Sequence, residues 1–352
     1  MELLSVTMND GVKPRSEIEG KDNSSEDKSN YKIVHKGDMV YNSMRMWQGA
    51  NGISPCDGIV SPAYTVLMPK QEINNGYFAA LFKSVTLINE FRKNSQGMTS
   101  DTWNLKYPQI ETIKVQIPSV SEQDKVSELF SVLDERIATQ AQLVESLKKY
   151  KRGLLSQLIA QKKAFDTSGE WKTVKLGHIF KERTERAKGN ETLLAVTISN
   201  GVQRRDEIDL KDNSSDDKSN YKCVYIGDIA YNTMRMWQGA SGVSPYNGIV
   251  SPAYTIVTPI RPDLHNMTFW AYYFKYNPLV QTFQKYSQGL TSDTWNLKFP
   301  QFSEIAVTMP PISEQDKIAE CLSVFDEHCK CEDEKLQALL LVRTSLLQQL
   351  FI

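Results

Sequence analysis

Two segments of the chain carry apolar residues at alternating spacings of four and three, which is typical of a helix in a coiled coil. The first has Val126, Phe130, Leu133, Ile137, Val144, Leu147, Leu154 and Leu158, and the second has Ile318, Leu322, Phe325, Cys329, Leu336, Leu339, Leu346 and Leu350. Each segment follows proline and Ser-Glu-Gln-Asp, at 121–124 and 313–316. Serine as N-cap with an acidic residue at N3 is a capping box. The pattern predicts long helices over 121–163 and 313–352.

Polar residues interrupt both apolar stripes at equivalent places: Gln140 and Lys151 in the first helix, Glu332 and Arg343 in the second. An antiparallel pairing that places Lys151 opposite Glu332 also places Gln140 opposite Arg343, and every apolar position then meets an apolar one. Polar core positions of this kind fix register at a cost in stability. We therefore predict an intramolecular antiparallel helix pair about 57 Å long. The alternative is two helices that each pack elsewhere.

The remaining segments alternate short apolar runs with Gly, Pro, Ser and Asn, which is typical of β-strands and turns. Lys32–His35, Asp38–Tyr41 and Tyr64–Leu67 are predicted strands. Apolar residues at helical spacing predict one helix over about 76–92 and another over about 267–286. The expected fold class is α+β, with two β-rich α/β domains joined by the helices.

The chain is an internal duplication. Met234–Ala240 repeats Met44–Ala50 at an offset of 190, and Thr291–Leu297 repeats Thr99–Leu105 at an offset of 192. This period is far longer than that of a solenoid. The duplication predicts a first globular domain at 1–120, a helix at 121–163, a second globular domain at 164–312 and a helix at 313–352.

The second copy has an opening segment, beginning at Trp171, for which the first copy has no equivalent. Met1 falls opposite about residue 190 of the second copy. Two readings stay open: the first domain lacks its opening strand, or the start codon is misassigned.

Composition excludes several classes of protein. The 352 residues carry a net charge of −1, so no basic footprint advertises nucleic-acid binding. No apolar run approaches the roughly 18 to 20 residues that cross a bilayer, and the N-terminus lacks the pattern of a secretory signal. We therefore expect a cytoplasmic protein, and any affinity for nucleic acid must come from local clusters or from partner subunits.

No residue pattern points to catalysis or to a metal. Neither G-x-x-x-x-G-K-S/T nor G-x-G-x-x-G occurs in the sequence. The four histidines are scattered, and His35 corresponds to Tyr225 of the second copy. Cys329 and Cys331 correspond to Ile137 and Thr139 of the first copy, so a metal site shared by both copies is not expected. We expect no cofactor and no metal in this chain, and we do not expect an enzyme.

Three duplicated segments carry side chains suited to DNA. Arginine reads guanine, Asn and Gln read adenine, Trp stacks on bases, and Lys, Ser and Thr contact phosphates. The candidate DNA-binding residues of the first copy are Asn42, Arg45, Trp47, Gln48, Lys28, Gln96, Thr99, Ser100 and Trp103. Those of the second copy are Asn232, Arg235, Trp237, Gln238, Lys218, Gln288, Thr291, Ser292 and Trp295.

Each candidate has a structural alternative. Trp47 and Trp237 are also compatible with core or hinge packing in place of a DNA contact. Arg45 and Arg235 are compatible with internal salt bridges, and the acidic neighbours of Lys28 with a merely solvated loop.

With these residues identified, the chain resembles the specificity (S) subunit of type I restriction-modification systems. The matching features are Gly-Ile-Val-Ser-Pro-Ala-Tyr at 58–64 and 248–254, Met-Arg-Met-Trp-Gln-Gly at 44–49 and 234–239, and Trp-x-x-x-x-Leu-Gly at 171–177. The most specific is Ile/Met-Pro-x-x-Ser-Glu-Gln-Asp-Lys before each long helix. The resemblance covers nearly the whole chain.

The resemblance implies two target recognition domains, each reading one half of a bipartite site in double-stranded DNA. It also implies two modification subunits that use S-adenosylmethionine to methylate adenine N6, and two restriction subunits that use ATP and magnesium. Antiparallel helices relate the domains by a pseudo-two-fold axis, and dyad proteins read inverted half-sites. Because the candidate loops are unchanged between copies, we predict a near-palindromic site. The rival hypothesis is a non-catalytic scaffold built on the helix pair.

Overall fold

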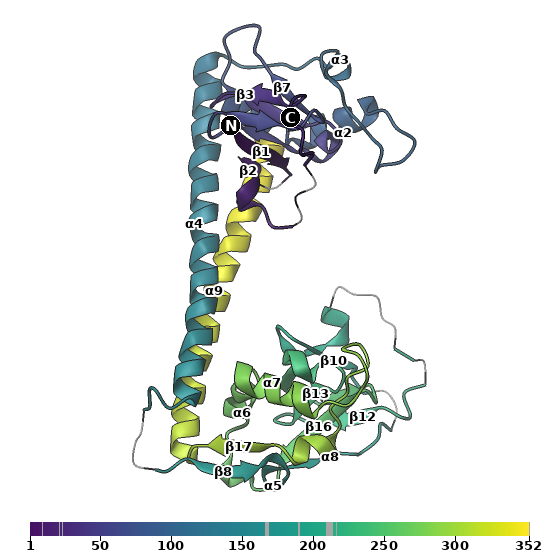
Figure 1. Ribbon diagram of the computed structural model, residues 1–352, viewed down its shortest axis with the longest axis vertical. Helices are drawn as coiled ribbons and strands as arrows, with labels where there is room; N and C mark the ends of the chain where they lie inside the picture. Colours follow the sequence, from purple (N-terminus) through teal and green to yellow (C-terminus); the bar gives the residue numbers. More distant parts are fainter. Residues whose placement is uncertain are drawn as a thin grey trace. The chain divides into compact units, whose positions relative to one another are not determined.

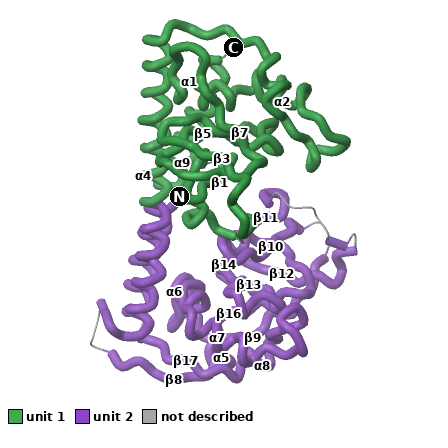
Figure 2. The backbone as a smooth tube through the Cα atoms, turned by 45° about the horizontal axis from the view of Figure 1, so that its top comes forward, with its two compact units in different colours: residues 1–143, 332–352 green, residues 144–331 purple. Residues whose placement is uncertain are grey.

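The structure is a computed structural model, in which the chain forms two compact units. The described residues are 1–8, 10–20, 22, 24–165, 169–188, 191–208, 214–215 and 217–351. The first unit joins Met1–Leu143 to Glu332–Ile352, and the second is Val144–Cys331 (Figure 2). Each unit therefore combines one globular domain with one end of a pair of long helices, α4 (Val120–Ile159) and α9 (Ile312–Leu350).

Among the described residues, the first globular domain consists of two small sheets and three short α-helices, some of which are labelled in Figure 1. One sheet has the order β2-β1-β6-β3, with β1 and β6 parallel, and the other has the order β5-β4-β7. Its elements are β1 (Glu2–Thr7), β2 (Gly11–Pro14), η1 (Arg15–Glu17), β3 (Lys32–Val34), β4 (Met39–Asn42), η2 (Met46–Gln48), β5 (Asn51–Ile53), β6 (Gly58–Val60), β7 (Tyr64–Leu67), α1 (Asn75–Leu81), α2 (Val85–Asn94) and α3 (Tyr107–Ile110). The three predicted strands are thus present as β3, β4 and β7.

The second globular domain repeats this plan and adds an opening segment. That segment is β8 (Lys172–Lys175), α5 (Leu176–Ile179) and β9 (Phe180–Glu182). β9 extends a sheet of order β14-β13-β16-β9, and β8 pairs with β17. The other elements are β10 (Leu194–Thr197), β11 (Gly201–Arg204), η3 (Arg205–Glu207), β12 (Lys222–Val224), β13 (Ile229–Asn232), η4 (Met236–Gln238), β14 (Ser241–Val243), β15 (Gly248–Val250), β16 (Tyr254–Pro259), η5 (Pro262–Leu264), α6 (Met267–Tyr273), α7 (Asn277–Tyr286), α8 (Phe299–Ser303) and β17 (Ala306–Met309).

The α+β fold class is confirmed, but the single helix predicted in each domain is wrong. The structure has two helices in each place, α1 and α2 in the first domain, α6 and α7 in the second. In the first domain α1 ends at Leu81, and Ser84 caps the next helix by accepting a hydrogen bond from Leu87 N at 3.3 Å. In the second, Pro278 stands in the first turn of α7, where its missing N–H is harmless but its ring prevents a continuous helix.

The predicted capping boxes are also corrected. The reciprocal box lies two residues earlier, where Ser119 N donates to Glu122 Oε2 at 3.1 Å and Glu122 N donates to Ser119 Oγ at 3.4 Å. The second long helix has no such box at the equivalent place because that position is Pro311.

The Ser-Glu-Gln-Asp motif instead attaches each long helix to its domain. Asn74, which caps α1, donates its main-chain N–H to Gln123 Oε1 at 2.9 Å and its side-chain amide to Asp124 Oδ1 at 2.7 Å. In the second domain Asn266 makes the same two bonds to Gln315 and Asp316, at 3.0 and 2.7 Å. The motif is therefore a domain anchor.

The helices run antiparallel in each unit, but the predicted register is wrong. In the first unit Gln140 Nε2 donates to Glu332 Oε2 at 2.7 Å, whereas Gln140 was expected opposite Arg343. Arg343 instead donates to Asp134, with Nη2 3.2 Å from Oδ2. The observed partner lies six residues from the predicted one for Arg343 and eleven residues from it for Gln140.

The second unit contains the equivalent contact. Lys151 pairs with Asp326 rather than with Glu332, and Tyr272 donates a further hydrogen bond to the same carboxylate at 2.6 Å. A slip of one heptad keeps most apolar positions facing apolar ones, although the polar breaks then face apolar residues, so the stripes choose the register only through these few positions. Carboxylates beside the stripe, Asp134 and Asp326, favour the observed one. Helix α4 ends at Ile159, before the predicted boundary at 163.

Within the described residues, no helix combines the length and apolarity needed to cross a membrane.

Candidate nucleic-acid interface

The first candidate segment is a tight turn that follows β4. Asn42 Oδ1 accepts a hydrogen bond from Met44 N at 3.1 Å, which folds the chain directly after the strand. Met46, fully buried, anchors the one-turn helix η2 in the core. Gly49 ends η2 with φ +80°, a left-handed conformation that suits glycine. Asn42 therefore shapes the turn, and its side-chain oxygen is not free for a base.

The second candidate segment is a hairpin loop between α2 and α3. Gln96 and Asn104 exchange main-chain hydrogen bonds of 3.0 and 2.8 Å, closing the loop at its base. Thr102 Oγ1 donates to Thr99 O at 2.9 Å across its interior. The outer residues, Thr99 and Ser100 among them, are exposed. In Figure 1 the connection from α2 to α3 projects from the first domain.

The structure brings these two segments together. Trp47 and Trp103 pack edge to face with ring centroids 5.1 Å apart, and Leu105 N donates to Ser43 O at 2.8 Å. The second domain repeats the arrangement, with the Trp237 and Trp295 rings 5.2 Å apart. Segments separated by about fifty residues thus form one surface in each domain.

The tryptophans belong to the framework of this surface. Trp47 Nε1 donates to Met44 O at 3.1 Å and Trp237 Nε1 to Met234 O at 3.0 Å, so neither indole N–H is available to a ligand. Both rings are half-buried. Each ring pair orients the turn against the hairpin loop.

Other side chains on the surface retain their hydrogen-bonding capacity. Within the part of the chain that the structure describes, the Arg45 and Arg235 guanidinium groups take part in no ion pair or hydrogen bond, so the internal salt bridge considered above is absent. The same holds for the side-chain amides and hydroxyls of Gln48, Gln96, Ser100, Gln238, Gln288 and Ser292. Arginine and glutamine donors left free in this way are the groups that read base edges.

The third candidate segment lies apart from this surface and holds its own lysine. Lys28 Nζ donates to Ser24 Oγ at 2.7 Å and lies 4.9 Å from the centroid of the Tyr31 ring. Lys218 makes the equivalent contacts with Ser214, at 2.8 Å, and with the Tyr221 ring. The ammonium groups organise the loop, which argues against a primary role in phosphate binding. Lys21, also part of this segment, lies outside the described residues.

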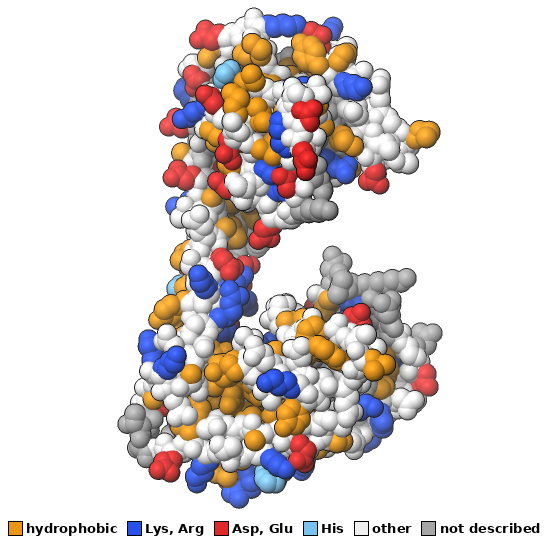
Figure 3. Space-filling view, in the orientation of Figure 1, with side chains coloured by type: hydrophobic (Ala, Val, Ile, Leu, Met, Phe, Trp, Pro, Cys, Tyr) orange, Lys and Arg blue, Asp and Glu red, His pale blue; other side chains and the backbone are white. Residues whose placement is uncertain are grey.

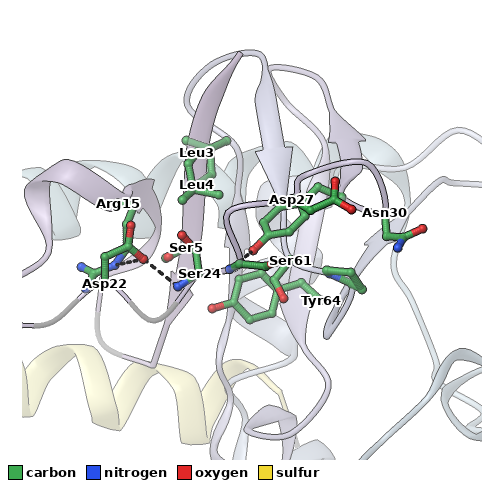
Figure 4. A pocket seen from close by; sticks show the side chains of 13 residues that line it. Leu3, Leu4, Ser5, Arg15, Asp22, Ser24, Asp27, Asn30, Ser61 and Tyr64 are labelled. Atoms are coloured by element: carbon green, nitrogen blue, oxygen red, sulfur yellow. Dashed lines mark hydrogen bonds and ion pairs between the residues drawn. The ribbon is translucent and has the colours of Figure 1, made fainter.

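The same loop covers an open cavity of about 580 Å³ in the first domain (Figure 4). Its lining is mainly polar, with Asp22, Asp27 and Arg15 at the rim, and Asp22 accepts a hydrogen bond from Ser24 N at 2.9 Å. That backbone bond holds the pKa of Asp22 below its usual value, as the Ser29 N–H does for Asp27. Two ionised carboxylates at the rim make the cavity unfavourable for nucleic-acid phosphate.

Sequence reasoning missed one contributor to the surface. The Arg92 guanidinium, on α2, lies 5.8 Å from the centroid of the Trp47 ring. Its equivalent on α7 is Gln284, which lines a shallow cavity with Lys285 and Trp295. Sequence reasoning missed Arg92 and Gln284 because both lie on the solvent-exposed face of their helices, where polar residues are expected. The two domains also differ in charge here, because Arg92 corresponds to the neutral Gln284.

The surface suits binding rather than bond making. Neither Tyr41–Ala50 nor Gln96–Asn104 contains a histidine or a cysteine, the commonest general base and the most reactive nucleophile. Lys, Arg, Asp and Glu side chains are interspersed on the visible face of the first domain (Figure 3).

Comparisons with known proteins agree on one family. The model of the type I restriction modification DNA specificity domain matches residues 5–149 and 168–341. The type I restriction enzyme MjaVIII specificity subunit of Methanocaldococcus jannaschii is 28% identical over 184 residues, which are 49% of this chain and 41% of that protein. The match thus spans less than half of the relative's length.

Two solved structures share the fold. The type I restriction-modification S subunit from M. genitalium gives a TM-score of 0.56 at 16% identity, covering 91% of this chain and 84% of the other. A chain from a structure described as showing complex assembly and conformational transition of the type I R-M system gives 0.56 at 14% identity, covering 92% and 83%.

Proposed function

Because this chain belongs to the family of type I restriction-modification DNA specificity proteins, we propose that it recognises DNA sequence for a restriction-modification complex. Each globular domain contacts one half of a bipartite site. The observation that carries this proposal is the surface formed by the turn and the hairpin loop, present in both domains with the same Trp–Trp contact. On it, Arg45, Gln48 and Gln96 keep donors that no described residue uses.

The two half-sites are the same, or nearly so, and inverted. The turn and the loop have the same sequence at nearly every position in both domains, and their hydrogen bonds agree closely, as for Thr102 to Thr99 and Thr294 to Thr291, both 2.9 Å. Side chains with the same hydrogen-bond donors, held in the same backbone geometry, read the same bases. The antiparallel helix segments in each unit support the inverted order.

Methylation and cleavage belong to other chains in this proposal. Two modification subunits bind S-adenosylmethionine and methylate adenine N6 in each half-site, while two restriction subunits use ATP and magnesium. The reading surface itself offers donors and aromatic rings but no nucleophile paired with a base. DNA in the cell is the substrate, so the complex works in the cytoplasm.

Methylome sequencing tests the proposal. The chain is co-expressed with the modification subunit of its own system, and methylated adenines are mapped by single-molecule sequencing. We expect one bipartite motif whose halves are inverted repeats separated by a nonspecific spacer. Two unrelated halves would contradict the palindrome alone. If the complex assembles but neither methylates nor binds any sequence preferentially, the chain is a scaffold and the proposed function is wrong.

A further inference from the structure

The most exposed large apolar side chains in the described part of the protein lie at the same point of both domains. Met98 is 99% exposed and Leu290 is 101% exposed. Each stands at the outer end of its hairpin loop, beyond the paired residues Gln96 and Asn104 or Gln288 and Asn296. Single exposed apolar residues are common on protein surfaces. An exposed apolar residue that recurs at the same position of the hairpin loop in both domains is stronger evidence of a function than a single one.

The backbone beneath each tip is tightly constrained. Gly97 has φ +145°, and a Cβ there would lie 2.6 Å from Thr102 O. Gly289 has φ +144°, and a Cβ there would lie 2.6 Å from Thr294 O. No other residue type fits either position, because both the conformation and the space require glycine. The loop thus holds its apolar tip in a fixed place before any ligand arrives, which lowers the entropy lost on binding.

The tip varies where its surroundings do not. Between Gln96–Leu105 and Gln288–Leu297 only Met98 and Leu290 differ. Both are long, flexible apolar side chains of similar volume, so the substitution preserves the size and the apolar character of the tip. Beside the tip, Gln96 and Ser100 carry the unused polar groups described above. The apolar tip is therefore part of the reading surface.

Charge near the tip disfavours the sugar-phosphate backbone of DNA as its contact. Asp101 and Asp293 are exposed within the same turns, and a carboxylate there is repelled by backbone phosphates. The faces of the bases are the apolar surface that DNA offers, and proteins insert Met, Leu and similar side chains between base steps, partly unstacking them.

We propose that Met98 and Leu290 insert between adjacent base pairs, one in each half-site. This rests on the proposed function, because it requires a half-site under each domain. Insertion opens one base step, and the unstacking cost is offset by burial of the aliphatic side chain. Steps that unstack easily are favoured at this position, so the tip adds selectivity without hydrogen bonds.

The test uses the complete chain with its modification subunit and a duplex carrying the methylated motif. 2-Aminopurine, whose fluorescence rises when it is unstacked, replaces one base at a time in each half-site, excluding the methylated adenine. Binding of the unaltered complex should raise the fluorescence at one step in each half. Met98→Ala should abolish the rise in one half-site and weaken binding about 10-fold, and Leu290→Ala should do the same in the other.

Matched controls are available in both domains. Met68 is 84% exposed in the first domain and Ile226 is 66% exposed in the second, both outside the hairpin loops. Met68→Ala and Ile226→Ala should leave fluorescence and affinity unchanged. Because Met98 and Leu290 make no core contact, their replacement should also leave the thermal midpoint unchanged.

Failure of the wedge and failure of the proposed function give different results. If the unaltered complex binds no sequence preferentially, both fail. If it binds its motif but no step unstacks, or if Met98→Ala and Leu290→Ala behave like the unaltered chain, only the wedge is wrong. If these variants lose the modification subunit in the absence of DNA, the tips are protein contacts and the wedge is also wrong.

Discussion

The described residues of the two globular domains build the same candidate surface on different amounts of core. In the second domain the opening segment buries Leu176, Ile179 and Phe180, each no more than 1% exposed. Strand β8 of this segment pairs with β17, so that Val307 is 4% exposed. In the first domain the equivalent residue, Val115, belongs to no strand and is 39% exposed.

The edge of the second sheet differs in the same way. Strand β9 covers β16 in the second domain, whereas β7, the equivalent strand of the first domain, is at the edge among the described strands. An edge strand leaves main-chain groups unpaired. Even so, the Trp–Trp distances of the two domains are 5.1 and 5.2 Å. Local hydrogen bonds fix the geometry of the surface, while the opening segment supplies stability.

Removing the centre of the opening segment should have the largest effect. Phe180 is fully buried against Trp270 and Phe274. Phe180→Ala should lower the free energy of unfolding of the second unit by about 3–5 kcal/mol, as measured by urea denaturation followed with Trp fluorescence. Lys181→Ala is the control, since Lys181 is exposed on the same strand. Equal stability of the two variants would refute a core role for this segment.

Adding the segment to the first domain tests the same comparison in the other direction. Fusing a copy of residues 169–190 before Met1 keeps the alignment of the two copies. We expect the first unit to gain about 2 kcal/mol, because apolar side chains such as Leu176 and Phe180 each contribute that order when buried. The control fusion carries Leu176→Ser, Ile179→Ser and Phe180→Ser. A gain with the control as well would show that added chain length, rather than burial, is responsible.

A pH titration distinguishes the domains through a residue that only one of them has. His265 of the second domain is 8% exposed, and its equivalent is Ile73. Burial lowers the pKa of His265 below the ordinary 6.5, against the opposing effect of Asp263. The unfolded chain therefore takes up this proton at higher pH than the folded chain, and stability falls as pH drops below about 6.5.

The second unit should therefore lose stability between pH 6.5 and 5.5. His265→Ile should remove this loss without altering the first unit. Differential scanning calorimetry between pH 7.5 and 5.5 measures both transitions. If the pH dependence is the same in both variants, His265 is not its source.

The smallest effect concerns helix register. Asp134→Ala should destabilise the first unit by about 0.5 kcal/mol through loss of the exposed pair with Arg343. Asp326→Ala should cost somewhat more, because Tyr272 also donates to that carboxylate. A double-mutant cycle of Asp134 with Arg343 measures the coupling. Coupling between Gln140 and Arg343 instead would restore the register predicted from the stripes.

Local patterns determined most of what could be predicted. The strands around β3, β4 and β7 were evident because each is short and bounded by turn residues, and the helices because their stripes are long. The break at Ser84 was missed since apolar spacing continues through it. The register was missed because a heptad repeat largely matches itself after one step, and the deciding residue, Asp134, lies beside the stripe.

The candidate site could be predicted only in part, for a related reason. Residue types that read bases drew attention to Arg45, Gln96 and their equivalents. The contact between Trp47 and Trp103 could not be foreseen, because it depends on how α2 and α3 place the hairpin loop. Arg92 was missed because it lies on the exposed face of α2, where the sequence shows only the regular polar spacing of an amphipathic helix.

The central claim is that the domains read separate half-sites through equal surfaces, and two single substitutions test it most directly. Arg45→Ala and Arg235→Ala are each expressed with the modification subunit, and methylated adenines are mapped by single-molecule sequencing. Each should relax one position in opposite halves of the motif, with a loss of about 1–3 kcal/mol of discrimination there. Unchanged motifs, or relaxation of the same half by both variants, would contradict the account.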